Sequence, residues 1–255
     1  MCEKKILVSL AVKAEFAPWQ RLRAFRQVQF RGCSFHQARI GNAEVRVILT
    51  GVGARQADDL NELAAQYRPD AGIVAGVAGG LKPGLQAGEI LVAESVWSED
   101  QNKSIRSDPG LFDDAVQCGA TAVGRLLTVA HVVRTPEAKR ALAHAGDAAD
   151  MESLAVMQQL SREMIPAVAI RVIADTARES VPYDFEATLD SQGQIRLWRL
   201  APELIIRPWM LAHAVQLGIK CRRATMTLAG YLDRFVQQLA AQRTVPQSLL
   251  TSVRQ

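Results

Sequence analysis

Carboxylates and glycine turns follow several apolar runs of this 255-residue chain. The candidate residues are Glu15, Asp150, Met151, Glu152 and Asp175, together with glycine-rich turns at 51–53 and 76–80. A carboxylic acid can donate or accept a proton, and a carboxylate can stabilise a developing cation. A glycine turn lets the backbone approach a ligand closely. These residue types predict acid–base chemistry on a small ligand, provided that the fold brings them together.

Each of these patterns also has a purely structural explanation. A glycine after a strand often only makes a tight turn, and GVAGG at 76–80 lacks the G-x-G-x-x-G spacing of a dinucleotide site. Glu15 and the acids at 150 and 152 could be first-turn residues favoured by a helix dipole, and Asp175 could cap the segment after its strand. The four histidines share no metal-ligand spacing, and no serine lies in a nucleophile-elbow pattern. Taken one at a time, the patterns leave both explanations open.

The elements that would position these residues alternate between strands and helices. Apolar runs predict buried strands at 6–12, 45–50, 71–77, 90–96, 126–133 and 167–174. Helical spacing predicts helices at 15–27, 54–67, 136–144 and 151–163, with Thr135 and Pro136 as the cap and first residue of the third. The alternation favours an α/β fold with a mixed central sheet covered by helices on both faces. Ligands in such folds gather beyond the carboxyl ends of the strands, where the candidate residues stand.

Two segments are expected to differ from this plan. Residues 100–116 are polar and contain Asp108-Pro109-Gly110, so we expect an exposed excursion there. From Pro202 to about Ala241 the pattern is helical but broken near Pro208 and around 218–223, which predicts two or three helices. We therefore expect an α/β domain at 1–200 and a helical C-terminal extension at 201–255 packed on it.

Composition and charge exclude several classes of protein. Hydrophobic residues make up 49% and charged residues 22% of the chain, which is typical of a globular protein. The net charge is +4 and the basic residues are scattered, so we expect no nucleic-acid partner. The four cysteines match no zinc or redox spacing, which favours a reduced cytoplasmic compartment and no metal site. We expect no signal peptide, because the apolar run that follows the first two lysines is too short, and no uninterrupted apolar run in the sequence reaches the length of a membrane span.

Five segments taken in order resemble the nucleoside phosphorylase and nucleosidase superfamily. ILVSLAVKAEF is similar to its opening strand and acidic loop, and ILTGVGARQADD to its glycine turn before a helix. RPDAGIVAGVAGGLKPGLQAGEILVAESV resembles its core strand, G-x-A-G-G turn and next strand. ADMESLAV and AIRVIADTA are similar to its ribose-contacting segment and to the strand that ends in the catalytic Asp. The resemblance implies an enzyme that cleaves the N-glycosidic bond of a purine nucleoside.

The resemblance also assigns roles to the candidate residues. Asp175 would protonate the departing purine, and Met151 and Glu152 would contact the ribose, with Glu152 accepting hydrogen bonds from its hydroxyls. Glu15 stands where related nucleosidases carry an acid near the nucleophilic water. The residues of the nucleophile or phosphate side would be Gly53, Arg55, Gly76, Val77 and Gly79.

The attacking group is either water or phosphate. Phosphorylases of the family hold phosphate with arginines and a Ser or Thr at the core glycine turn, where this chain has Ala75-Gly76-Val77. This departure and the presence of Glu15 favour hydrolysis over phosphorolysis. Lys13 and Arg55 could still contact phosphate, so phosphate stays open as a co-substrate. The resemblance implies no other cofactor, and it implies a homo-oligomer.

The tail at 187–224 is similar to the C-terminal region of hopanoid-associated phosphorylases, which release adenine from adenosylhopane. We therefore expect a 5′-substituted adenosine as substrate, with adenosylhopane as the first choice. The alternatives are a methylthioadenosine or S-adenosylhomocysteine nucleosidase, a purine nucleoside phosphorylase, and a nucleoside-binding module without activity.

Apolar residues with basic neighbours at 204–217 predict a peripheral contact with the inner face of a membrane, which would admit a lipid-linked substrate. Packing of this segment against the core or against a second subunit is the other interpretation.

Overall fold

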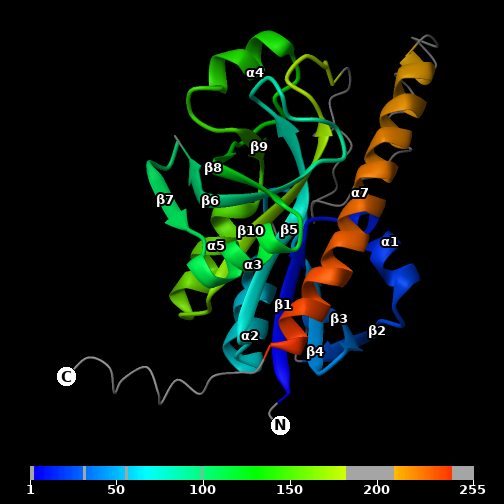
Figure 1. Ribbon diagram of the computed structural model, residues 1–255, viewed down its shortest axis with the longest axis vertical. Helices are drawn as coiled ribbons and strands as arrows, with labels where there is room; N and C mark the ends of the chain where they lie inside the picture. Colours follow the sequence, from blue (N-terminus) through cyan, green and yellow to red (C-terminus); the bar gives the residue numbers. More distant parts are fainter. Residues whose placement is uncertain (1–2, 31–32, 55–56, 99, 182–209, 243–255) are drawn as a thin grey trace.

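A ten-stranded mixed sheet forms the centre of the molecule, and helices cover both of its faces (Figure 1). The computed structural model describes residues 3–30, 33–54, 57–98, 100–181 and 210–242, with the backbone alone described at 57–58, 210–215 and 217. The strands are β1 (Lys4–Leu10), β2 (Arg26–Phe30), β3 (Cys33–Ile40), β4 (Ala43–Leu49), β5 (Ala71–Gly80), β6 (Ile90–Ser98), β7 (Lys103–Arg106), β8 (Thr121–Thr128), β9 (Ala148–Asp150) and β10 (Ala167–Asp175). The helices are α1 (Lys13–Leu22), the short 3-10 helix η1 (Val52–Ala54), α2 (Ala57–Tyr67), α3 (Pro109–Gln117), α4 (Pro136–Leu142), α5 (Ser153–Arg162) and α7 (Met210–Ala241).

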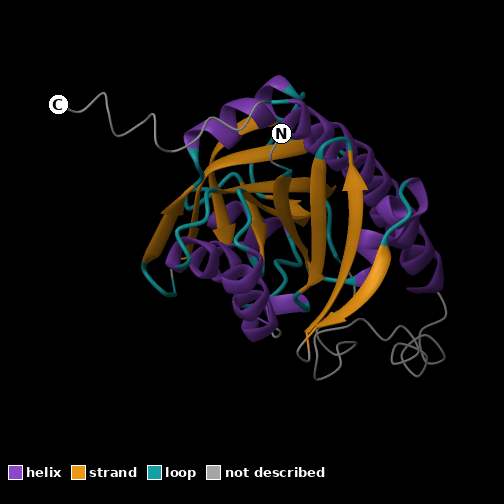
Figure 2. Ribbon diagram, turned by 90° about the horizontal axis from the view of Figure 1, so that it is seen from below, coloured by secondary structure: helices purple, strands orange, loops and turns teal. Residues whose placement is uncertain are grey.

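Two apolar cores, one on each face of the sheet, hold the helices in place. Side chains of α1, α3 and α7 fill the first core, and side chains of α2 and α5 fill the second. Viewed from below, the helices enclose the strands from both sides (Figure 2). Strands β1, β4, β5 and β10 run parallel to their neighbours among these four, and their apolar residues face both cores. The predicted fold class, a mixed sheet covered on both faces, is confirmed.

Part of the sheet closes on itself. Strand β10 pairs with both β6 and β5, so that β10, β6, β8, β9 and β5 form a ring. The short strand β9, which the sequence analysis did not predict, runs antiparallel to β5 and pairs Ala149 with Gly79. The chain that leaves β9 is therefore directed back along β5 toward Val77. This reversal directs the segment with Met151 and Glu152 toward the Val77 region of β5. The glycine-rich turn predicted at 76–80 was wrong, because these residues belong to β5.

The first predicted helix is shorter than expected. Helix α1 ends at Leu22, which is 57% exposed, instead of continuing to 27. Phe25 lies beyond the helix, and its ring makes edge-to-face contacts with Phe16 and Trp19 at centroid distances of 5.0 and 5.1 Å. The spacing of the apolar residues between 15 and 27 therefore indicates one buried aromatic cluster and not one continuous helix. The hairpin β2–β3 that follows was also not predicted.

The polar segment 100–116 is not simply an exposed excursion, because it contains β7 and α3. The Asp108 carboxylate accepts a hydrogen bond from the Leu111 N–H at 3.0 Å and caps α3. Leu111 and Ala115 are buried, and the Tyr231 hydroxyl of α7 donates to the Ala115 carbonyl at 2.7 Å. A short helix buries one narrow stripe, so its mean polarity is high even when it packs on a core. The prediction was wrong for this reason.

The C-terminal region is one continuous helix over its described part. Helix α7 passes through 218–223, where a break was predicted, and packs alongside α1, which it joins through the Arg23–Asp233 ion pair at 2.7 Å (Figure 1). Gly218 stands in open space on its surface and costs the helix about 1 kcal/mol relative to alanine, which a long packed helix tolerates. The predicted break near Pro208 lies outside the described residues, and the division into 1–200 and 201–255 stays a prediction. No helix within the described ranges is long and apolar enough to span a membrane.

Candidate active site

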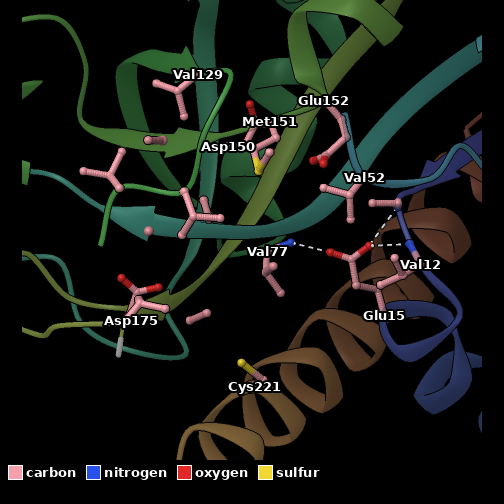
Figure 3. A pocket seen from close by; sticks show the side chains of 18 of the residues that line it. Val12, Glu15, Val52, Val77, Val129, Asp150, Met151, Glu152, Asp175 and Cys221 are labelled. Atoms are coloured by element: carbon pink, nitrogen blue, oxygen red, sulfur yellow. Dashed lines mark hydrogen bonds between the residues drawn. The ribbon is translucent and has the colours of Figure 1, made fainter. Parts of the chain in front are cut away.

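A pocket of about 250 Å³ lies at the carboxyl ends of β1, β5, β9 and β10. Its polar lining includes Glu15, Glu152 and Asp175, with Val77 and Met151 between them (Figure 3). Glu15 and Glu152 lie at one end of the pocket and Asp175 lies at the other (Figure 3). The rest of the wall is mostly apolar and includes Val12, Val52, Leu81, Val129, Val132, Val133 and Val181. The fold therefore gathers acids from three separate sequence segments around one apolar space.

Glu15 is buried and fully engaged by backbone donors. One carboxylate oxygen accepts hydrogen bonds from the N–H groups of Ala11 and Val12 at 2.8 and 3.2 Å, and the other accepts from Val77 at 2.9 Å (Figure 3). Burial raises the pKa of Glu15, while the nearby Arg171 guanidinium and these backbone donors lower it. Glu15 does lie in the first turn of α1, but it is not a solvent-exposed acid, because its exposed fraction is 5%.

Glu152 likewise binds a backbone N–H, in the glycine turn at 51–53. Its carboxylate accepts a hydrogen bond from the Gly53 N–H at 3.0 Å, and η1 places that N–H within reach. Gly53 has φ near +72°, in the left-handed region that glycine adopts without strain. Burial raises the pKa of Glu152 to about 7, with Arg171 opposing this shift and the neighbouring acids adding to it. This carboxyl group therefore titrates close to neutral pH.

Arg171, which the sequence analysis did not single out, holds the acids of this end together. Its guanidinium is 2% exposed, forms an ion pair with Asp150, and donates to the Ser153 hydroxyl at 3.1 and 2.7 Å. Its Nη1 lies 3.9 Å from a Glu152 oxygen and is buried without a hydrogen-bond partner. Asp150 also accepts from the Thr128 hydroxyl at 2.8 Å and from the Ser153 N–H at 3.1 Å. A charged residue inside the apolar run at 167–174 was the signal that could have identified Arg171, because a buried charge requires partners.

Asp175 lies at the opposite end of the pocket, beside a buried lysine that the sequence analysis also missed. Lys139 of α4 has an exposed fraction of 0%, and its ammonium group forms an ion pair with Asp175. Burial raises the pKa of Asp175, while Lys139 opposes the shift. The Asp175 carboxyl group lines a pocket where a proton donor could act.

The remaining predicted residues are placed as follows. Gly79 lines the pocket, and a Cβ added there would lie 3.2 Å from Asp175 Oδ2. Gly76 lies behind the pocket wall, because a Cβ added there would meet Arg171 Nη1 at 2.0 Å and Glu15 Oε1 at 3.0 Å. Lys13 is exposed and does not line the pocket, and Arg55 lies outside the described residues.

The two ends of the pocket differ in chemistry. One end holds the carboxylates of Glu15 and Glu152, which suit hydroxyl groups, a cation and a water molecule. The other end holds one carboxyl group near an apolar wall, which suits a flat base that must gain a proton. Within the described ranges, no three metal-ligating side chains gather at one point.

The chain is similar in sequence to known proteins. A profile of the Phosphorylase superfamily matches residues 5–122. A 5′-methylthioadenosine/S-adenosylhomocysteine nucleosidase from Geobacillus kaustophilus is 26% identical over 200 residues, covering 68% of this chain and 85% of the relative. The protein of the same name from Marinomonas sp. is 27% identical over 189 residues, covering 64% and 82%.

Comparison with solved structures shows the same fold. An S-adenosylhomocysteine nucleosidase from Streptococcus pyogenes, solved with 5-methylthiotubericidin, has a TM-score of 0.72 at 17% identity and covers 94% of this chain and 98% of its own. The native futalosine hydrolase of Helicobacter pylori has a TM-score of 0.70 at 17% identity, with coverage of 92% and 98%. At these identities the likeness concerns the fold alone.

Proposed function

We propose that this chain is a nucleosidase of the phosphorylase superfamily, whose profile matches residues 5–122, and that it hydrolyses the N-glycosidic bond of a 5′-substituted adenosine. The sequence relatives described above are named 5′-methylthioadenosine/S-adenosylhomocysteine nucleosidases. The pocket supports the proposal because it combines a sugar end, rich in carboxylates, with a base end that holds a buried acid. Its apolar wall, which includes several valines, suits an apolar 5′-substituent.

One observation favours water over phosphate as the attacking group. The two backbone amides that could hold a phosphate, those of Val77 in β5 and Gly53 in η1, already donate to the carboxylates of Glu15 and Glu152. A phosphate dianion at this end would lose these donors and would lie beside two acids. Arg171 compensates little, because its charge is already shared with Asp150. Water faces no such repulsion.

The proposed reaction moves two protons. The C1′–N9 bond breaks and its electron pair passes to the purine, while Asp175 donates a proton to N7. A water oxygen bonds to C1′ and its proton passes to Glu15, so that the products are adenine and the free sugar. The carboxylate of Glu152 accepts from the ribose hydroxyls and, with Glu15, stabilises the cationic sugar. Glu15 serves as a base only when ionised, and the Arg171 guanidinium favours that state.

The test is to incubate the protein with 5′-methylthioadenosine, S-adenosylhomocysteine and adenosine, with and without phosphate, and to separate the products by chromatography. We expect free adenine and a free sugar at rates that do not depend on phosphate. Strict phosphate dependence with a sugar 1-phosphate as product would replace hydrolysis by phosphorolysis. Tight nucleoside binding without base release would identify the alternative class, a nucleoside-binding module.

We further propose that the 5′-substituent is large and apolar, as in adenosylhopane, and that the protein contacts a membrane through 204–217. The resemblance of 187–224 to hopanoid-associated phosphorylases supports this substrate. Helix α7 exposes Ile219 and Met226, at 47% and 55%, next to the exposed Arg222 and Arg223. Apolar and basic side chains on one surface helix favour an anionic bilayer.

Two measurements decide this finer proposal. Adenine release from adenosylhopane in vesicles should exceed release from 5′-methylthioadenosine. The protein should sediment with anionic vesicles, while a Trp209→Glu variant should not. If the small nucleosides are the better substrates and nothing sediments, the protein is an ordinary small-nucleoside nucleosidase. The homo-oligomer and the cytoplasmic location stay predictions, and light scattering checks the first.

A further inference from the structure

Lys139 is a fully buried charge that the proposed reaction does not use directly. Its exposed fraction is 0%, although it belongs to the short surface helix α4. The ammonium group donates to Asp175 Oδ2, to the Thr176 carbonyl at 2.7 Å and to the Glu179 carbonyl at 2.8 Å. Burying an ammonium ion costs several kcal/mol unless its partners compensate. All three N–H groups of the Lys139 ammonium therefore have acceptors, and one of these acceptors is Asp175, the acid at the base end of the pocket.

The other charged groups around Asp175 are engaged elsewhere. Glu179, from the segment after β10, forms an ion pair with Lys220 of α7 and accepts from the Thr176 N–H at 2.9 Å. Cys221 of α7 lines the pocket, and burial raises the pKa of its thiol to about 11. Among the described residues, Lys139 is the one cation that bonds to Asp175 directly.

We propose that Lys139 is a positioning residue, which fixes one oxygen of Asp175 and stabilises the carboxylate that forms when Asp175 gives its proton to the departing base. The inference rests on the proposed function and adds to it a determinant of the pH dependence.

The physical reason is the change of charge during the reaction. Asp175 is neutral before it donates its proton and anionic afterwards, so a fixed cation on Oδ2 favours the later state. With Oδ2 held by the ammonium group, Oδ1 is left for the base. Burial raises the pKa of Asp175 and favours its protonated form, whereas Lys139 lowers that pKa and favours the carboxylate. The two effects together set the pH above which Asp175 is ionised and cannot donate.

The experiment compares Lys139→Gln with Lys82→Gln. Lys82 also pairs with an aspartate, Asp147 at 2.5 Å, but it is 52% exposed and lies outside the pocket lining. Glutamine keeps donors for the Thr176 and Glu179 carbonyls but removes the charge. We expect the alkaline limb of kcat in Lys139→Gln to move up by about one pH unit or more. Its plateau rate should fall by about tenfold or more, because the acid is weaker and less well oriented. Lys82→Gln should match the wild type in both respects.

A double-mutant cycle separates this role from a role in the fold. In the Asp175→Asn background, Lys139→Gln should change the residual rate by less than about twofold, since the group that it assists is gone. An unmoved alkaline limb, or equal losses in both backgrounds, would overturn the proposal. Failure of Lys139→Gln to fold would also count against it, because Lys139 would then serve the fold. If the wild type releases no base from any nucleoside, the proposed function itself fails. If the wild type is active and Asp175→Asn is inactive, the proposed function stands, and the Lys139 results then test only the role of Lys139.

Discussion

Gly76 tests whether the sugar end of the pocket is built as described, because a single methyl group there would disturb two site residues at once. The Cβ of Gly76→Ala would lie 2.0 Å from Arg171 Nη1 and 3.0 Å from Glu15 Oε1. Nη1 would have to retreat by more than about 1 Å to reach ordinary van der Waals contact. The guanidinium cannot do so freely, because Asp150 and Ser153 hold its other nitrogens.

The expected loss follows from this displacement. A misplacement of about 1 Å in a catalytic arrangement can reduce the rate by about 100-fold, which corresponds to roughly 2.7 kcal/mol of transition-state stabilisation. Overpacking of a buried site destabilises the fold by about 1–3 kcal/mol. Gly76→Ala should therefore remain folded at 25 °C while losing about two orders of magnitude in kcat/KM.

The assay measures kcat/KM for adenine release together with urea unfolding of the same preparations. Gly124→Ala is the matched control, since its new Cβ would meet nothing closer than Asp147 Oδ2 at 3.8 Å. We expect the control to keep near wild-type activity. A Gly76→Ala protein with kcat/KM within about threefold of the wild type would refute the placement of Arg171 and Glu15 beside Gly76 of β5.

Three further changes test other parts of the site. Asp175→Asn should lower kcat by about two to four orders of magnitude with an unchanged circular dichroism spectrum, and near wild-type turnover would remove Asp175 from its role. Arg171→Met should lower the free energy of unfolding by about 3–5 kcal/mol, because it leaves the buried Asp150 carboxylate unpaired; a loss under about 1 kcal/mol in urea titrations would contradict this. Glu152 has a folded-state pKa raised from 4.5 to about 7, so its protonated form stabilises the fold below pH 4.5 and this contribution is lost as the pH rises through about 7. Wild-type stability should therefore fall relative to Glu152→Gln between pH 5 and pH 8, and parallel curves would show that the carboxyl group is not perturbed.

The sequence alone was sufficient for the fold class and for the kinds of residue at the site. Apolar runs and helical spacing predicted most of the parallel strands and the helices α2, α4 and α5, because burial on a sheet or under a helix imposes a local period. Thr135 caps α4 as predicted, with its hydroxyl accepting from the Ala138 N–H at 3.2 Å. The acids that follow the strands could be named for the same reason, since ligand sites in α/β folds lie beyond strand ends.

The partners of those acids were decided by the tertiary structure. Glu15 meets the Val77 N–H across 62 positions of sequence, and Lys139 meets Asp175 across 36. Such contacts depend on the order and register of the strands, for example on the antiparallel pairing of β9 with β5. A local period of apolar residues encodes neither order nor register. In the sequence, Arg171 is a single charged residue within an apolar run. In the fold it contacts Asp150, Ser153 and Glu152, which come from another segment of the chain. A local pattern reports which face of an element is buried, but only the assembled sheet determines which charges are buried together.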